Sequence, residues 1–205
     1  MPAIPDCSYP GQSQLRDRAI AALDRGMEDR RTEFKSAEEW PVLKKHIVRT
    51  AMAMANLRDG GDIIVGVSGE SDGWKITGIT DEVLQTFDPD DVLDAVNRHA
   101  SPPVSLEIVL VHHREVKFLV IAVQEFSQLP IICQRAGDGL VAGSVYIRPA
   151  KKPETRRVEN AEEMRELLDL AIEKGIQRFH RTVTRLGYEP PEGHLERFDD
   201  ELEGL

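Results

Sequence analysis

Residues 60–69 read GGDIIVGVSG, and this short stretch decides the fold class. Its apolar residues are all β-branched and glycines bound it on both sides, a pattern typical of a strand buried in the middle of a sheet. The next segment, GWKITGIT at residues 73–80, is predicted to pair with it as a hairpin across a turn at residues 70–73. A sheet with residues 61–67 near its centre is therefore expected.

Periodic segments on both sides of this strand predict the other elements. Helices are expected over residues 15–23 with a stop at Gly26, from near Trp40 to Leu57, after a cap at Asp88 or Asp90, and from a capping-box-like start at Asn160 and Glu163. Strands are expected over residues 31–35, 104–113, 116–124, 130–134 and 143–149, with a hairpin turn near Arg114. The predicted fold class is α/β (α+β), a mixed, largely antiparallel sheet of about six strands with about three or four helices.

Composition and charge limit the classes of function. The chain has 205 residues and a formal net charge of −10, so it cannot coat nucleic acid by bulk charge, and such binding would need a local basic patch. We expect a flexible leader at residues 1–12, one domain at 13–187 and an acidic, disordered tail at 188–205. With no long apolar run and no signal peptide, the expected location is cytoplasmic, without a membrane partner.

The stretch GMEDRRTEFKS, residues 26–36, places two carboxylates, Glu28 and Glu33, just ahead of a lysine. In a strand, alternation sends Glu33 and Lys35 to one face and Phe34 to the other, so we expect Phe34 in the core and the two charges on an exposed face. Such a face is either an ordinary amphipathic edge or a small polar site. In the second case the carboxylate pair would bind a metal ion, with Lys35 neutralising developing charge.

The stretch IRPAKKPETRR, residues 147–157, gathers positive charge in an acidic chain. It holds Arg148, Lys151, Lys152, Arg156 and Arg157 against a single acid. This run is either a solvated loop or a footprint for a phosphate backbone, which would position nucleic acid without reading its sequence. Other cations could extend the footprint if the fold brings them near, namely Arg30, Arg31, Lys44, Lys45 and Arg49.

Taken in order, several of these pieces resemble the Schlafen-type AlbA domain. They are Glu28-x-x-x-x-Glu33-Phe34-Lys35, a helix ending Ala53-Met54-Ala55-Asn56, Gly60-Gly61, Ile63-Ile64-Val65-Gly66-Val67 and Tyr146-Ile147-Arg148, within about residues 14–175. The resemblance implies an α/β domain of bacterial regulators and Schlafen proteins, described as binding DNA or RNA and sometimes labelled ATP-binding. It also implies a regulatory or defence-related role, and a homodimer, because Schlafen nucleases use two related lobes.

Some Schlafen proteins are metal-dependent ribonucleases that cut transfer and ribosomal RNA with three carboxylates, and Glu28 and Glu33 match the first two. The third, an aspartate directly after the strand's Gly-Val pair, is missing, because Ser68 and Gly69 stand there. Glu70 or Asp72 could replace it if the turn bends back. With fewer carboxylates a hard cation such as Mg²⁺ or Mn²⁺ would be held weakly.

Three hypotheses follow, in order of preference. The first is nucleic-acid binding through a set of cations comprising Arg31, Arg148, Lys151, Lys152, Arg156 and Arg157, adjoined by Lys35. The second is a Mg²⁺- or Mn²⁺-dependent endoribonuclease acting on structured RNA such as tRNA, with Glu28, Glu33, Lys35 and Asp72 as catalytic residues and Glu28, Glu33 and Glu70 as metal ligands. The third is a protein-interaction module. A nucleotide cofactor is not expected, because residues 61–68 lack the lysine of a Walker A loop.

Overall fold

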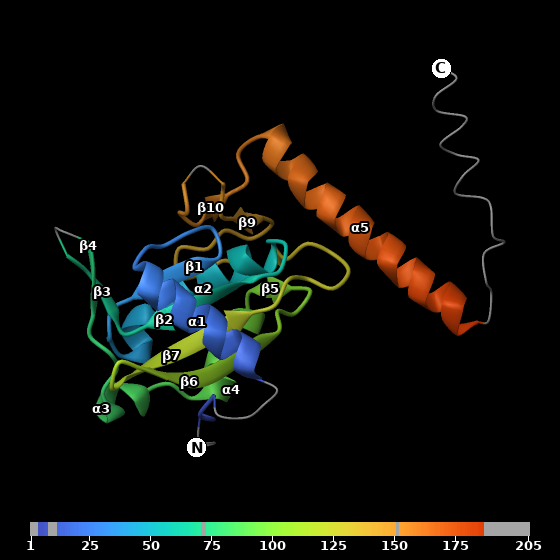
Figure 1. Ribbon diagram of the computed structural model, residues 1–205. Helices are drawn as coiled ribbons and strands as arrows, with labels where there is room; N and C mark the ends of the chain where they lie inside the picture. The colour runs from blue at the N-terminus through green and yellow to red at the C-terminus, as the bar shows by residue number, and fades with distance from the viewer. Residues whose placement is uncertain (1–3, 8–11, 71–72, 151, 187–205) are drawn as a thin grey trace.

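The computed structural model describes residues 4–7, 12–70, 73–150 and 152–186 (Figure 1). At its centre is a four-stranded sheet in the order β1 (Thr32–Lys35), β2 (Gly61–Val65), β7 (Val116–Val123) and β6 (Leu106–His113). β1 and β2 run parallel, joined by helix α2 (Trp40–Ala55), and the other two pairs are antiparallel. The predicted mixed, largely antiparallel sheet is confirmed.

Smaller elements surround this sheet. Three two-stranded antiparallel pairs are formed by β3 (Val67–Glu70) with β4 (Gly73–Ile76), β5 (Ala100–Ser101) with β8 (Ile132–Cys133), and β9 (Tyr146–Ile147) with β10 (Arg156–Arg157). The other helices are α1 (Ser13–Arg25), α3 (Asp81–Leu84), α4 (Pro89–Asn97) and α5 (Ala161–Arg185). The described residues thus form more short strands and one or two more helices than the sequence suggested.

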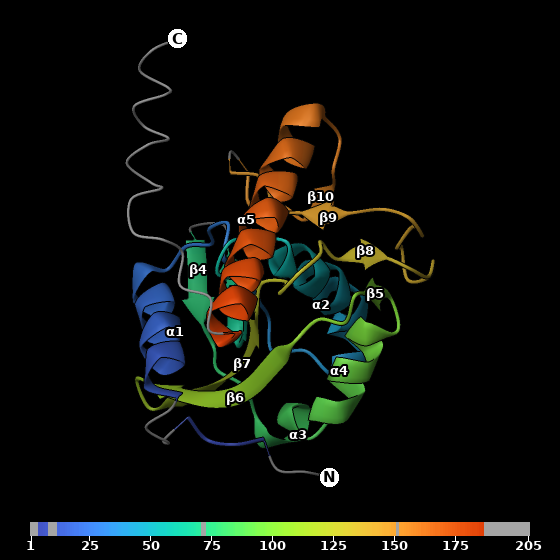
Figure 2. The same cartoon turned by 90° about the vertical axis from the view of Figure 1, so that its right-hand side faces the viewer.

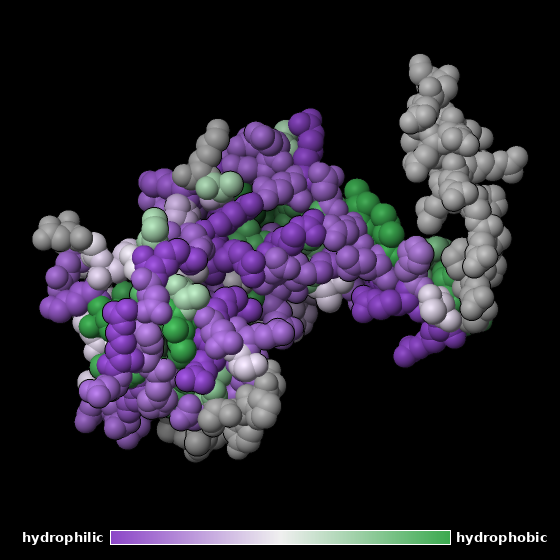
Figure 3. Space-filling view, viewed as in Figure 1, coloured by the Kyte–Doolittle hydropathy of each residue, from purple (hydrophilic) through white to green (hydrophobic). Residues whose placement is uncertain are grey.

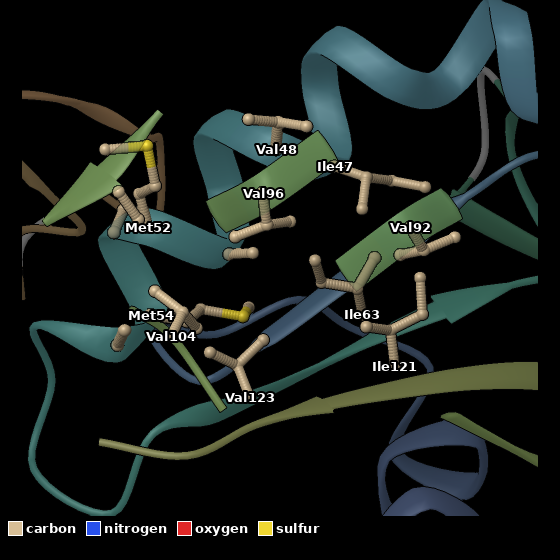
Figure 4. Close-up of a cluster of buried hydrophobic side chains, with 14 of the residues drawn as sticks. Ile47, Val48, Met52, Met54, Ile63, Val92, Val96, Val104, Ile121 and Val123 are labelled. Carbon is tan, nitrogen blue, oxygen red and sulfur yellow. The ribbon is translucent and has the colours of Figure 1, made fainter. Parts of the chain in front are cut away.

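Helices cover both faces of the sheet, as Figure 2 shows. On one face, β2 and β7 send Ile63, Val65 and Ile121 toward α2 and α4, where they join the larger hydrophobic core (Figure 4). On the other face, Phe34 and Ile64 pack with α1. Because successive strand residues point to opposite faces, both faces of β2 are apolar, as the β-branched run predicted.

The helix ends follow the capping signals in the sequence. Gly26 ends α1 in the left-handed conformation, with φ of 63°. The Asp88 side chain caps α4, and the Asn160 side chain accepts the N–H of Glu163 at the start of α5. Local side-chain chemistry therefore set these boundaries as expected.

The hairpin predicted for residues 60–80 is only partly right. The strand does not continue through Gly66, which has φ of 118° and donates its N–H to the carbonyl of Lys35. β2 pairs with β1 and β7, and only the continuation, β3, pairs with β4. A Cβ at Gly66 would come within 2.9 Å of the carbonyl carbon of Gly78, so the chain turns here at a position that favours glycine.

Helix α5 follows β10 in the chain, and Figure 1 shows it slanting away from the central sheet. Within the described part of the chain, no helix is both long enough and apolar enough to cross a membrane. The predicted leader falls mostly, and the predicted acidic tail entirely, outside the described residues. The proposed domain limits therefore stay a prediction.

Candidate functional site

Arg148, just after β9, is the most deeply buried charge near the predicted carboxylates. Its side chain is 0% exposed, and its guanidinium donates to the Glu33 carboxylate at 2.5 Å. It also donates to three backbone carbonyls: those of Asp29 at 2.9 Å and Arg30 at 2.9 Å in the turn before β1, and that of Thr32, the first residue of β1, at 3.2 Å. These bonds compensate the cost of burying the charge and fix the approach to β1.

The prediction that Arg148 contacts nucleic acid stays a prediction, and the burial of this side chain argues against it. A phosphate could reach its guanidinium only if the Glu33 pair and the three carbonyl bonds opened. The residue links β9 to the start of β1 instead. The sequence could not show this. An arginine in a basic run is expected to be exposed, and its burial here depends on a carboxylate 115 positions away in the chain.

Glu28 and Glu33 lie together, as predicted, but not on an exposed face. The Glu33 side chain is only 14% exposed and that of Lys35 20%, and the two form an ion pair. Both point to the α2 side of the sheet, because Glu33 is in register with Ile63. The expected exposed face is thus covered by α2 and the segment before β10.

Glu28 comes before β1 and bends back onto it. Its carboxylate accepts the backbone N–H of Phe34 at 2.8 Å. Burial, and secondly the charge of Glu33, raise the pKa of Glu28 above its ordinary value, against the opposing effects of the Phe34 N–H, Lys35 and Arg148. The two carboxylates therefore differ in their partners: Glu33 forms ion pairs with two cations, whereas Glu28 is partly buried beside it and accepts a backbone N–H.

A polar cavity of about 240 Å³ opens where these residues meet α2. Its walls come from three places: the start of the sheet, the exposed side of α2 and the loop before β10. The lining residues are Glu28, Glu33, Lys35, His46, Arg49, Thr50, Pro153, Glu154 and Thr155. The hydroxyls of Thr50 and Thr155 lie 3.4 Å apart and join the helix to the loop. No sequence pattern singles out His46, Thr50 or Thr155 for this site, because only tertiary contact brings them here.

Three cations lie on α2, and of these Arg49 lines the cavity. Lys44, Lys45 and Arg49, hereafter the α2 cations, form no hydrogen bond or ion pair with any residue that the structure describes. Two of them affect His46: burial lowers the pKa of His46 below its ordinary value, and the charges of Lys35, Lys45 and Arg49 lower it further, against the opposing charge of Glu33. The helix thus presents unpaired positive charge beside a polar cavity.

The predicted basic run behaves differently from the α2 cations. Lys152 pairs with Glu154 at 2.6 Å, and Arg156 pairs with Glu163 and with Glu159. Arg157 is exposed and has no side-chain partner among the described residues, whereas Lys151 lies outside them. Most of this run is therefore occupied by internal ion pairs or buried.

Arg31 lies away from the cavity. Its guanidinium donates to the carboxylate and the carbonyl of Asp59, each at 3.3 Å, in the turn before β2. It is not among the residues that line the cavity. A phosphate contact at Arg31 would belong to a separate surface.

The described residues do not fit the predicted three-carboxylate metal site. Glu70 is exposed on the β3–β4 hairpin and pairs with Lys75 at 3.1 Å, and it does not line the cavity; Asp72 lies outside the described residues. Across the part of the chain that is described, no group of three His, Cys, Asp or Glu side chains could hold a metal ion. Each oxygen of the Glu33 carboxylate already faces a cation, Lys35 or Arg148, so a metal ion would have to displace one of them to bind it.

Comparison with known proteins gives one family. A family model described as "Schlafen, AlbA_2" matches residues 28–176, which include both glutamates, Arg148 and the α2 cations. No curated protein matches the chain at a significant level.

Two solved structures are similar to part of this chain. The DIP2311 protein from Corynebacterium diphtheriae is 18% identical, with a TM-score of 0.48; the match covers 75% of this chain and 29% of that one. The N-terminal domain of a protein from Nitrosomonas europaea, described as related to the ATP-dependent DNA helicase RecG, is 22% identical with a TM-score of 0.40, and the match covers 73% and 89%. This chain thus spans under a third of the DIP2311 protein.

Proposed function

The chain belongs to the Schlafen AlbA_2 family, and on that premise we propose that it binds nucleic acid through the α2 cations, of which Arg49 lines the polar cavity. The observation that carries the proposal is the unpaired state of Lys44, Lys45 and Arg49 in an acidic chain whose other cations near the cavity are paired. A phosphate that binds a paired cation must first break the existing ion pair, which costs free energy. At the α2 cations that cost is absent among the described residues.

The cavity suits a single phosphate group rather than a whole nucleotide. Its volume of about 240 Å³ is below the roughly 300–1,000 Å³ of pockets that enclose larger ligands. Donors reach it from Lys35, Arg49 and the hydroxyls of Thr50 and Thr155. Contacts of this kind fix the position of a nucleic-acid backbone without reading its sequence.

The glutamates do not prevent an anion from approaching. Arg148 and Lys35 compensate the charge of Glu33, Lys152 pairs with Glu154, and burial together with the charge of Glu33 raises the pKa of Glu28. The net charge of the cavity wall therefore depends on the buried Arg148, although Arg148 does not itself line the cavity.

The test is binding of labelled transfer RNA and of duplex DNA across a range of salt concentrations. Lys45→Ala with Arg49→Ala is compared with Lys75→Ala and Arg98→Ala, two cations on the hairpin and at the end of α4. Each lost phosphate contact lowers the slope of log affinity against log salt by about 0.9 on duplex DNA, so the α2 variant should lower it by about 2 and the control by about 0. Equal slopes for both variants would contradict the proposal.

The same samples, incubated with Mg²⁺ or Mn²⁺ and with chelator, test the ribonuclease alternative. Glu28→Gln is a better control for cleavage than a substitution of Glu33. The amide keeps an acceptor for the Phe34 N–H, and the ion pair between Arg148 and Glu33 stays intact. Metal-dependent cleavage that this variant abolishes would favour the enzyme. If neither nucleic acid is retained at low salt, the protein-interaction alternative takes precedence.

A further inference from the structure

The side of α5 that packs on the body carries apolar residues in its first half and arginines in its second. Leu167 and Leu170 are buried in the larger hydrophobic core, and Lys174 pairs with Glu125. Three exposed arginines each stand eleven positions, about three helical turns, after one of these α5 residues: Arg178, Arg181 and Arg185. The arginines therefore continue the body-facing side of the helix.

A cleft of about 500 Å³, hereafter the arginine cleft, lies between this half of α5 and the loop that follows β7. Its lining residues are Ser127, Gln128, Arg178, Arg181, Thr182 and Arg185. Three of these side chains are arginines and none is acidic. The hydroxyls and the amide add neutral donors, so an anion entering the cleft meets hydrogen-bond donors and no carboxylate.

The arginines of the cleft lack the carboxylate partners that other charges of α5 have. Three glutamates in the first half of the helix form ion pairs with arginines outside it: Glu163 with Arg156, Glu166 with Arg30 and Glu173 with Arg58. In the second half, Arg178 donates to the side-chain oxygen of Gln128, a neutral group. Arg181 donates to the carbonyl of Gln177, and Arg185 has no partner among the described residues.

The helix dipole does not explain this set of charges. It favours a base in the last turn, which accounts for Arg185 alone. At 1.5 Å per residue, the row from Arg178 to Arg185 is about 10 Å long, which exceeds the size of one phosphate group. One strand of a duplex carries a phosphate every 3.4 Å or so along the axis, so the row suits several successive phosphates.

An exposed aromatic ring stands next to the arginine cleft. Phe179 is 68% exposed and lines a second hollow, which shares Gln128, Arg178 and Thr182 with the cleft. Figure 3 shows green, apolar atoms beside purple, hydrophilic ones along this helix. Sites for single-stranded nucleic acid combine a positively charged groove with aromatic rings on which bases stack. A duplex keeps its bases stacked inside, so it could not use the ring in this way.

We propose that the arginine cleft binds single-stranded nucleic acid, with phosphates at its three arginines and a base stacked on Phe179. The inference rests on the proposed function, since the ligand is again a nucleic acid, but the surface is a second one. The residues that line the arginine cleft and those that line the polar cavity beside α2 do not overlap. An RNA with paired and unpaired parts offers a ligand for each surface.

The first test is the binding of a labelled, unpaired RNA of about twelve nucleotides to the full chain across a range of salt concentrations. Each lost phosphate contact lowers the slope of log affinity against log salt by about 0.7 on a single strand, so Arg181→Gln with Arg185→Gln should lower it by about 1.4. Arg98→Gln with Arg165→Gln, two exposed cations outside the cleft, should leave the slope unchanged. Circular dichroism of both variants should match the wild type, because all four side chains are exposed.

Substitutions of Phe179 test the stacking. Phe179→Ala should weaken single-strand binding by about 5- to 150-fold at every salt concentration, without changing the slope, because stacking involves no phosphate. Phe179→Tyr should keep the affinity and Phe179→Leu should not, since only the tyrosine retains a ring. The affinity for a duplex of the same length should be equal in all three variants.

The proposal would be overturned by an unchanged single-strand slope in the Arg181 and Arg185 variant, or by an equal loss of duplex and single-strand affinity in Phe179→Ala. Lys45→Ala with Arg49→Ala, measured in the same assay, separates this inference from the proposed function. If only the α5 variants weaken binding, the arginine cleft stands and the proposed role of the α2 cations fails. If only the α2 variant weakens binding, the arginine cleft is refuted and the proposed function stands.

Discussion

Replacing Arg148 should destabilise the fold far more than replacing any exposed arginine of the same basic run. In Arg148→Ala the Glu33 carboxylate loses a buried partner, and three backbone carbonyls at the start of β1 and in the turn before it lose their donor. Removing one member of a buried pair costs about 3–5 kcal/mol. For a chain of this size each kcal/mol lowers Tm by about 2–4 °C, so we expect a fall of roughly 10 °C.

Urea unfolding gives the free energy directly. Arg148→Ala should lower the midpoint at an unchanged slope, because the surface exposed on unfolding stays the same. The urea midpoint of Arg148→Lys should lie between those of the wild type and Arg148→Ala. The lysine ammonium can keep the ion pair with Glu33, but it lacks the planar guanidinium whose other N–H groups reach the carbonyls. Arg157→Ala is the matched control: the side chain is exposed and without a partner among the described residues, so its effect should stay within about 0.5 kcal/mol.

The structural role of Arg148 would be refuted by a loss below about 1 kcal/mol in Arg148→Ala, or by an equal loss in Arg157→Ala. In the first case the guanidinium would be accessible in solution, and the residue would return to the set of phosphate contacts. Nucleic-acid affinity measured well below the new Tm separates the two roles, because a purely structural residue leaves the salt slope of the folded protein unchanged.

Three further outcomes are expected from urea midpoints. Burial and a neighbouring carboxylate raise the pKa of Glu28, so its ionisation costs stability as pH rises above about 4.5; Glu28→Gln should stabilise the protein at pH 7, and this gain should shrink toward pH 4. Arg156 lowers the pKa of Glu163 to about 2, so Glu163→Gln should destabilise near neutral pH, with the difference fading as pH falls from about 4.5 toward 2. Gly60→Ala should cost about 2 kcal/mol or more, because φ is +67° and the new Cβ would lie 1.9 Å from the Val123 carbonyl oxygen.

Most of the secondary structure could be read from the sequence because its causes are local. The spacing of Leu15, Ala19, Ala22 and Leu23 predicts the buried face of α1, and these are its buried residues. Caps act in the same way, since the side chain and the N–H that it binds are a few residues apart. The break at Gly66 could not be read, because it depends on the β1 carbonyl that meets it and on the nearby Gly78.

The candidate site was predictable in part for the same reason. Alternation along β1 correctly puts Glu33 and Lys35 on one face, but alternation cannot say whether another element covers that face. The cover comes from α2 and from a loop more than a hundred positions later in the chain, where Thr50 meets Thr155. Burial of a charged residue is a long-range property, so the run at residues 147–157 was read as more exposed than it is.

Two of the residues that carry the family resemblance, Glu33 and Arg148, are joined by an ion pair. Glu33 and Arg148 are 115 positions apart and meet in a single buried ion pair, so neither is stable there without the other. In this chain the pair already has a structural use: it ties β9 to β1, while Lys35 takes the second oxygen of Glu33. A domain that only binds nucleic acid would keep both residues for that reason alone. The presence of Glu28 and Glu33 in a sequence is therefore not by itself a sign of metal-dependent cleavage; the sign to look for is a third carboxylate placed to share the cavity.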